Sequence, residues 1–137
     1  MTPIVRYMLL CHDVHPDAKN PACTDIECLM TNVVSLDEPP FPLLREQLCV
    51  HLALTDCHGQ GRVQVKVASV DYEDDLVCFG SAEHVLDFRQ HSPLEVLAVV
   101  FRIKDCEFPF AGRYSVQLWY NGEVLEERPL LLKSPSL

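Results

Sequence analysis

The chain has 137 residues, of which 48% are hydrophobic and 23% are charged, and its formal net charge at pH 7 is −9. This length fits one domain with a sizeable core, and the balance of apolar and charged residues excludes an intrinsically disordered chain. The negative charge, with eleven scattered Lys and Arg residues, argues against nucleic acid and anionic membranes as partners.

The N-terminal apolar segment, residues 4–11, is a poor secretion signal. Arg6 interrupts it, and Leu10 stands where a small residue would precede the cleavage site. No stretch reaches the roughly 18 apolar residues that suggest a membrane span. We therefore expect a cytoplasmic protein with no integral membrane segment. Seven cysteines, an odd number, then predict reduced thiols instead of a disulfide framework.

Short apolar segments predict five strands in the first part of the chain. Residues 47–54 and 62–67 alternate apolar and polar side chains around a Gly-containing turn, which predicts a β-hairpin. Three prolines within 37–42 separate this hairpin from the preceding strand, because proline has no amide hydrogen to donate to a β-ladder. The five predicted strands are 4–11, 26–36, 47–54, 62–67 and 76–79.

Three further strands are predicted after residues 81–93, which we interpret as a loop. Residues 94–104 are almost continuously apolar, which is typical of a central strand that is covered on most of its length. Residues 112–125 predict a hairpin, because Asn121 and Gly122 both tolerate the positive φ of a type I′ turn. The side chains that share one face of its first strand are Tyr114, Val116, Leu118 and Tyr120.

The spacing of these strands predicts an all-β fold. We expect an antiparallel β-sandwich of about eight strands, Ig-like or C2-like, with little helix. The sequence contains no internal repeat and no long amphipathic helix. We assign residues 1–133 to a single β-sandwich domain and residues 134–137 to a C-terminal tail.

Several stretches carry a family resemblance, namely 7–13, 63–67, 110–116, Asn121-Gly122 and Pro129-Leu130. Their order resembles a family of uncharacterised bacterial proteins with a domain of unknown function, and the similarity covers most of the chain. The resemblance implies a β-sandwich and supplies no catalytic residues.

Cysteine and histidine residues gather in one set of predicted loops. In a succession of antiparallel strands alternate connections emerge at opposite ends, so the loops after the first, third and fifth strands share one end. Imidazole and thiolate are ligand types that zinc prefers. The candidate zinc ligands are His12, His15, Cys23, Cys28 and His58. The alternative is that the cysteines are small buried residues and the histidines are solvated, since the spacing matches no zinc motif.

Acidic residues gather in the loops that the same alternation places at the other end. Carboxylates on adjacent loops are the ligands that calcium requires, and C2-type membrane-binding domains use them in this way. The alternative is an ordinary solvated surface. The residues are Asp37, Glu38, Asp71, Glu73, Asp74, Asp75, Asp105 and Glu107.

Catalysis is not expected. Cys57 and His58 are adjacent in the sequence, but neighbouring side chains of a strand point to opposite faces and do not form a dyad. The chain also has no nucleophile elbow, no phosphate-binding glycine loop and no HExxH motif.

The aromatic residues before the turn suggest a contact surface. Trp119 and Tyr120 lie on opposite faces of the predicted strand, and an exposed tryptophan is typical of protein contacts. The alternative is that Trp119 covers the sheet beneath residues 81–93 and is not exposed. We interpret the chain as a binding or assembly module for a protein partner or for self-association, with Trp119 and Tyr120 as candidate interaction residues. The alternatives are a zinc-type metal-binding protein and a calcium-dependent, membrane-associating C2-like domain.

Overall fold

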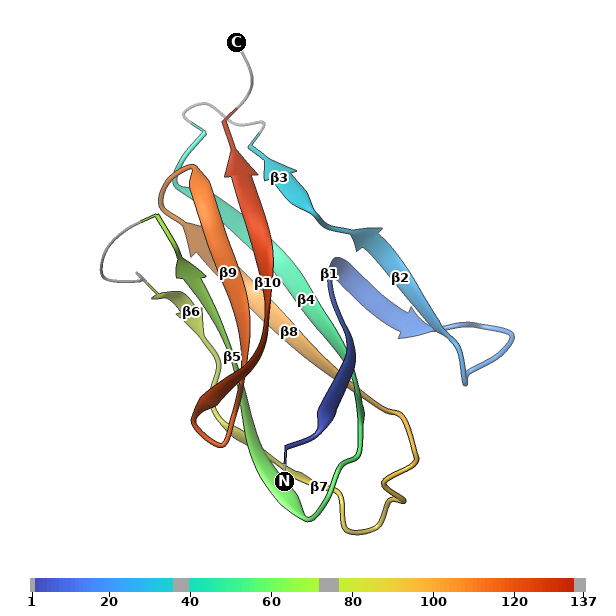
Figure 1. Cartoon of the computed structure of the whole chain (residues 1–137). Helices are drawn as coiled ribbons and strands as arrows, with labels where there is room; N and C mark the ends of the chain where they lie inside the picture. Colours follow the sequence, from blue (N-terminus) through green and yellow to red (C-terminus); the bar gives the residue numbers. More distant parts are fainter. Residues whose placement is uncertain (1, 36–39, 72–76, 135–137) are drawn as a thin grey trace.

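A computed structural model describes residues 2–35, 40–71 and 77–134, with only the backbone described for 77 and 78. These residues form ten β-strands and no helix, and the strands build two sheets that pack face to face (Figure 1). The predicted all-β sandwich is confirmed. The strands are β1 (Ile4–Pro16), β2 (Thr24–Leu29), β3 (Asn32–Val34), β4 (Leu43–Thr55), β5 (Gln60–Ser69), β6 (Val77–Gly80), β7 (His84–Asp87), β8 (Leu97–Phe108), β9 (Gly112–Tyr120) and β10 (Glu123–Lys133).

The smaller sheet has the order β2-β1-β4-β8, and all its neighbouring strands are antiparallel. The larger sheet has the order β3-β10-β9-β5-β6, and β7 also pairs with β5. All its pairs are antiparallel except β3 with β10. Strands from both ends of the chain therefore share one sandwich.

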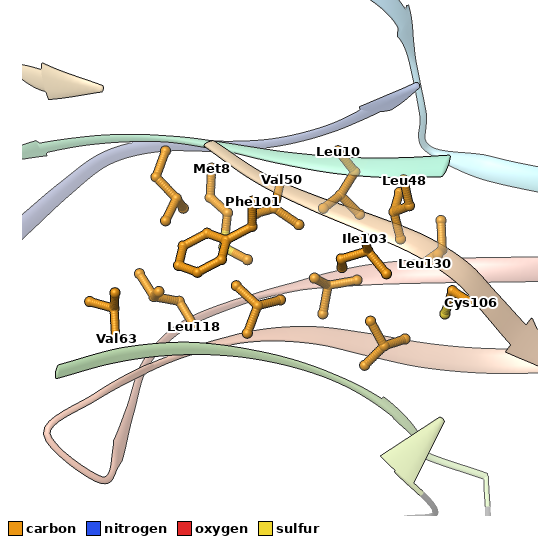
Figure 2. Close-up of a cluster of buried hydrophobic side chains, with 14 of the residues drawn as sticks. Met8, Leu10, Leu48, Val50, Val63, Phe101, Ile103, Cys106, Leu118 and Leu130 are labelled. Atoms are coloured by element: carbon orange, nitrogen blue, oxygen red, sulfur yellow. The ribbon is translucent and has the colours of Figure 1, made fainter. Parts of the chain in front are cut away.

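The core lies between the two sheets and follows the predicted alternation. The inward side chains of β4 and β9 are fully or almost fully buried, as are those of β5. Figure 2 shows these side chains meeting between the sheets. Tyr114 packs edge-on against Phe108 with ring centroids 5.0 Å apart, and its hydroxyl donates to the Phe110 carbonyl at 2.6 Å. The buried phenol thus keeps a hydrogen-bond partner.

The β9–β10 hairpin forms as predicted. Asn121 and Gly122 have φ angles of 51° and 84°, the positive values that a type I′ turn requires at both positions. The Asn121 amide donates to the Arg62 carbonyl, and the Asn121 Oδ1 accepts from the Arg62 amide at 2.9 Å. The turn is therefore attached to β5 as well as to its own strands.

Three predicted segments differ from the structure. The strand expected at 26–36 is two short strands, β2 and β3, which belong to different sheets. Residues 84–87, expected within a loop, form β7. The apolar segment 94–104 was expected to be central, but it supplies β8, the last strand of the smaller sheet. The segment is apolar because both of its faces are covered. Phe101 and Ile103 face the core, and on the outer face Val100 packs against Cys11, Val14 and Cys49.

Strand β1 changes partner along its length. Its residues Ile4–Cys11 pair with β4, and its residues Cys11–Pro16 pair with β2. Figure 1 shows the second half of β1 turning away from its first half and extending with β2 to one side of the sandwich. This bend decides where the loop residues lie.

Candidate binding groove along strand β8

The structure divides the predicted zinc ligands between two places. His12, His15, Cys23 and Cys28 all belong to the β1–β2 hairpin, whereas His58 lies elsewhere. His58 lies in the β4–β5 turn, beside the end of β1 that starts at Ile4, because Ile4 pairs with Thr55. His12 and His15 lie toward the other end of β1. The loop alternation failed because β1 bends and the second predicted strand is divided between the sheets. Within the described ranges, no three His, Cys, Asp or Glu side chains form a group that could hold a metal ion.

The same side chains have other partners or environments. The His58 Nε2 lies 2.8 Å from the Asp56 Oδ1, and the His15 Nδ1 lies 4.0 Å from the Asp25 Oδ2. Cys23 and Cys28 are exposed free thiols. Four further free thiols, those of Cys11, Cys49, Cys57 and Cys106, are buried. Burial of Cys57 raises its thiol pKa, so the structure gives no support to a Cys57–His58 dyad.

The predicted calcium ligands are only partly described. Asp37, Glu38 and residues 73–75 lie outside the described residues. Asp71 accepts hydrogen bonds from the Arg113 amide and side chain, which together lower the pKa of its carboxyl group. Asp105 and Glu107 lie on β8.

The two aromatic candidates do lie on opposite faces of β9, as predicted. Tyr120 is only 3% exposed and belongs to the core, so it is not available to a partner. The half-buried ring of Trp119 is covered by the Lys66 ammonium group, 4.0 Å from the ring centroid, and its Nε1 donates to the Gln117 Oε1. A contact through Trp119 stays a prediction.

The outer face of the smaller sheet holds a buried histidine. His51 is 2% exposed, and its Nδ1 has no partner in the described residues. Leu9 and Val100 flank it on the neighbouring strands, and the Tyr7 ring lies over it with a centroid distance of 5.2 Å. Desolvation lowers the pKa of His51.

This histidine predicts a pH dependence. Because the pKa of His51 is lower in the folded than in the unfolded protein, acidification below the ordinary value of 6.5 protonates the unfolded state first and destabilises the fold. The variant His51→Leu should lose less stability than the wild type between about pH 7 and about pH 5. Urea unfolding at both pH values measures the difference, and equal losses would contradict it.

A concave surface lies on the side of the sandwich where β8 faces β6 and β7. A cleft of about 380 Å³ is bounded by side chains of β5 to β8, and a second cleft of about 270 Å³ continues it. The two clefts share Leu86 and Val99, so together they form one surface, which we call the β8 groove. The larger cleft is lined mostly by apolar side chains and also by Ser81, His84 and Arg102; the apolar residues include Val63, Phe79, Leu86, Val99, Phe101 and Ile103.

The groove follows the edge of β8 from Leu97 to Ile103, roughly 20 Å at the rise of a β-strand. In the described part of the chain, β8 pairs with β4 and with no other strand. The backbone groups on its far side therefore have no ladder partner. A groove beside such an edge can receive an extended chain.

The opposite wall of the groove is shaped by an interruption between β6 and β7. Ser81 replaces regular pairing there, because its amide donates to the Val65 carbonyl and its Oγ accepts from the Val65 amide at 2.9 Å. Gln64 Nε2 also donates to the Ser81 carbonyl. These hydrogen bonds attach the segment between β6 and β7 to β5 while the chain changes direction. Such interruptions of regular pairing are common at sheet edges.

Two cations stand on the outer side of β8. Arg102 and Lys104 are exposed and alternate with the buried Phe101 and Ile103. The Arg102 Nε lies 3.3 Å from the Asp13 Oδ1, and the Lys104 ammonium contacts Gln47. Arg102 also donates to the Val14 carbonyl, so both cations contact strands on the β4 side of β8. A strand added beside β8 would meet apolar side chains on its inner face and would compete with these contacts for the cations on its outer face.

The sequence prediction missed this site. The apolar segment 97–101 is visible in the sequence, and so are the two cations that follow it. Their significance depends on β8 being an edge strand, which periodicity does not reveal. No described segment forms a helix that could cross a membrane.

Comparisons with known proteins identify a family and a fold. A model described as "Family of unknown function (DUF6941)" matches residues 6–133. A search of curated proteins finds no match. Among solved structures, the β-glucosidase from Listeria innocua in complex with isofagomine has 12% identity and a TM-score of 0.51, and the match covers 96% of this chain and 16% of that chain. Another structure of this enzyme has 13% identity, a TM-score of 0.50, and coverage of 79% and 15%.

A weaker similarity is to the Pseudomonas fluorescens alkylpurine DNA glycosylase AlkC bound to DNA containing an abasic site analog. It has 14% identity and a TM-score of 0.47, and the match covers 92% of this chain and 30% of that chain. The present chain thus spans less than a third of each of these proteins. At this level of identity the β-glucosidase matches reflect the fold alone.

Proposed function

The chain belongs to this family of unknown function, DUF6941, and within it we propose that the protein is a binding module that takes an extended segment of a protein partner as an added strand on β8. One observation carries this proposal: the free edge of β8 lies beside an apolar groove of the same length. Two exposed free thiols, Cys23 and Cys28, fit a reducing compartment such as the cytoplasm.

Strand addition divides recognition between backbone and side chains. The backbone of the added segment pairs with residues 97–103 and supplies affinity. Alternate side chains of the segment enter the groove against Phe79 and Leu86, which selects apolar residues. The intervening side chains face Ala98, Val100 and Arg102, and Lys104 follows just beyond this range, so carboxylates are favoured toward the end of the segment that lies beside the two cations.

The residue composition of the free β8 edge favours pairing with an added strand. Natural edge strands are usually guarded by charges, prolines or bulges. Residues 97–101 carry no charge and no proline, and the guarding features begin only at Arg102, with a positive φ at Asp105. Residues 97–101, which make up most of the edge beside the groove, therefore remain competent to pair.

A selection from displayed peptides of about seven residues, the length of a typical strand, tests the proposal. We expect selected peptides to alternate apolar and acidic residues and to slow amide hydrogen exchange at residues 97–103 of the wild-type protein. Leu86→Glu, which introduces a carboxylate at the groove wall, should weaken binding about tenfold or more. Val124→Glu, a change at an exposed position of β10, is the matched control.

The exchange measurement uses the wild-type protein, so it stands even if Leu86→Glu lowers stability. Selected peptides that protect another surface, or a selection without binders, would overturn the proposal.

A further inference from the structure

Strand β2 is the other free edge of the smaller sheet. All six of its residues are exposed, and within the described segments it pairs with β1 alone. Figure 1 shows β2 and the second half of β1 extending beside the body of the sandwich. Its outer edge is therefore accessible to another molecule.

The sequence of β2 has the chemistry that the β8 groove requires. Asp25 and Glu27 lie on one face of the strand, and Ile26, which is 40% exposed, lies on the other. An added strand on β8 needs apolar side chains toward the groove and carboxylates toward Arg102 and Lys104. β2 meets both requirements.

The surroundings of β2 leave its acidic face poorly neutralised. Glu27 pairs directly with Asp13 across the β1–β2 ladder, and like charges in this position repel. The Arg102 guanidinium lies beside the Asp13 carboxylate, whereas Asp25 lies near His15, at 4.0 Å, and near the side chain of Asp17. A cation from a second molecule would offset the repulsion at Glu27.

We infer that the partner at the β8 groove is a second copy of this chain, whose β2 pairs with β8 so that Ile26 enters the groove and Asp25 and Glu27 face Arg102 and Lys104. This inference rests on the proposed function and names its partner. The contact joins two different edges, so an open assembly of any length still presents one free β2 at one end and one free β8 at the other. Such a heterologous interface builds open chains or rings and does not end at a dimer.

Sedimentation velocity over a concentration series tests the inference. The average mass should rise with concentration beyond twice the 15.6 kDa of one chain. Lys104→Glu places a carboxylate opposite Glu27, and Glu27→Lys places an ammonium group opposite Lys104. Each variant alone should associate about tenfold more weakly.

A mixture of the two variants gives the decisive result. The β8 edge of the Lys104→Glu variant carries a carboxylate that matches the new ammonium group on β2 of the Glu27→Lys variant. The other two edges keep the wild-type pair of Lys104 and Glu27, so mixing should restore the larger assemblies. Misfolding cannot produce this rescue. Glu123→Lys, at an exposed position beside the β9–β10 turn, is the control and should leave the mass unchanged.

Monomers at every concentration, or assemblies that neither variant weakens, would overturn the inference. If selected peptides still protect residues 97–103 in that case, strand addition on β8 stands and only the identity of the partner is wrong.

Discussion

Replacing Leu118 with alanine should destabilise the protein by about 2–5 kcal/mol. Leu118 is fully buried on the inner face of β9, and it pairs with Val65 of β5. Figure 2 shows its side chain within the core cluster, between the two sheets. Neighbouring strands hold the backbone on both sides, so the sheet cannot collapse into the cavity that the substitution leaves.

Urea unfolding, followed by circular dichroism, measures this loss. Leu94→Ala provides the control, because Leu94 is 91% exposed and the same change there should shift stability by no more than about 0.5 kcal/mol. Similar losses in the two variants would show that Leu118 is not part of a rigid core.

Leu118 also illustrates what the sequence predicts well. The alternation through β9 identifies the buried face, and Asn121-Gly122 identifies the turn. Both signals are local: the period of two follows from strand geometry, and the turn follows from the φ angles that two residues tolerate. The structure confirms the predicted face and the positive φ angles of the turn.

The predictions that failed depend on relationships between distant segments. An apolar segment has the same sequence pattern whether its strand is central or lies at the edge of a sheet. The edge position of β8 therefore could not be predicted from residues 94–104. The division of residues 26–36 between two sheets depends on the bend of β1, and the periodicity of apolar residues does not indicate such a bend. These errors changed where the loops emerge, and for this reason His58 lies apart from the predicted zinc ligands of the β1–β2 hairpin.

The candidate site likewise has features that are local in the sequence and features that depend on distant segments. The exposed alternating strand 24–29 and the cations Arg102 and Lys104 can be identified in the sequence. Their relationship cannot, because it depends on β2 and β8 forming the two opposite edges of one sheet. Residue types thus suggest the chemistry of the surfaces, whereas the topology indicates which surfaces are free to meet.

Gly61→Ala should cost about 1–3 kcal/mol, although alanine is an ordinary strand residue. Composition predicts a turn at Gly61, but the structure places it in β5, facing the core. The Tyr120 ring lies directly over it, so an added Cβ would overlap the hydroxyl oxygen and two ring carbons. Tyr120 is 3% exposed, and its ring has little room to move away. The glycine is required for space and not for an unusual φ.

A double-mutant cycle distinguishes this steric cause from a loss of strand propensity. Tyr120→Leu removes the atoms that the new Cβ would meet, so Gly61→Ala should cost less in that background, with a coupling of about 0.5–3 kcal/mol. Gly80→Ala serves as the control, because a Cβ at Gly80 meets nothing within 4 Å. Urea unfolding of the four proteins in the cycle gives the coupling energy. Additive losses would mean that Tyr120 does not exclude a side chain at position 61, and the close approach of β5 to this ring would then have to be revised.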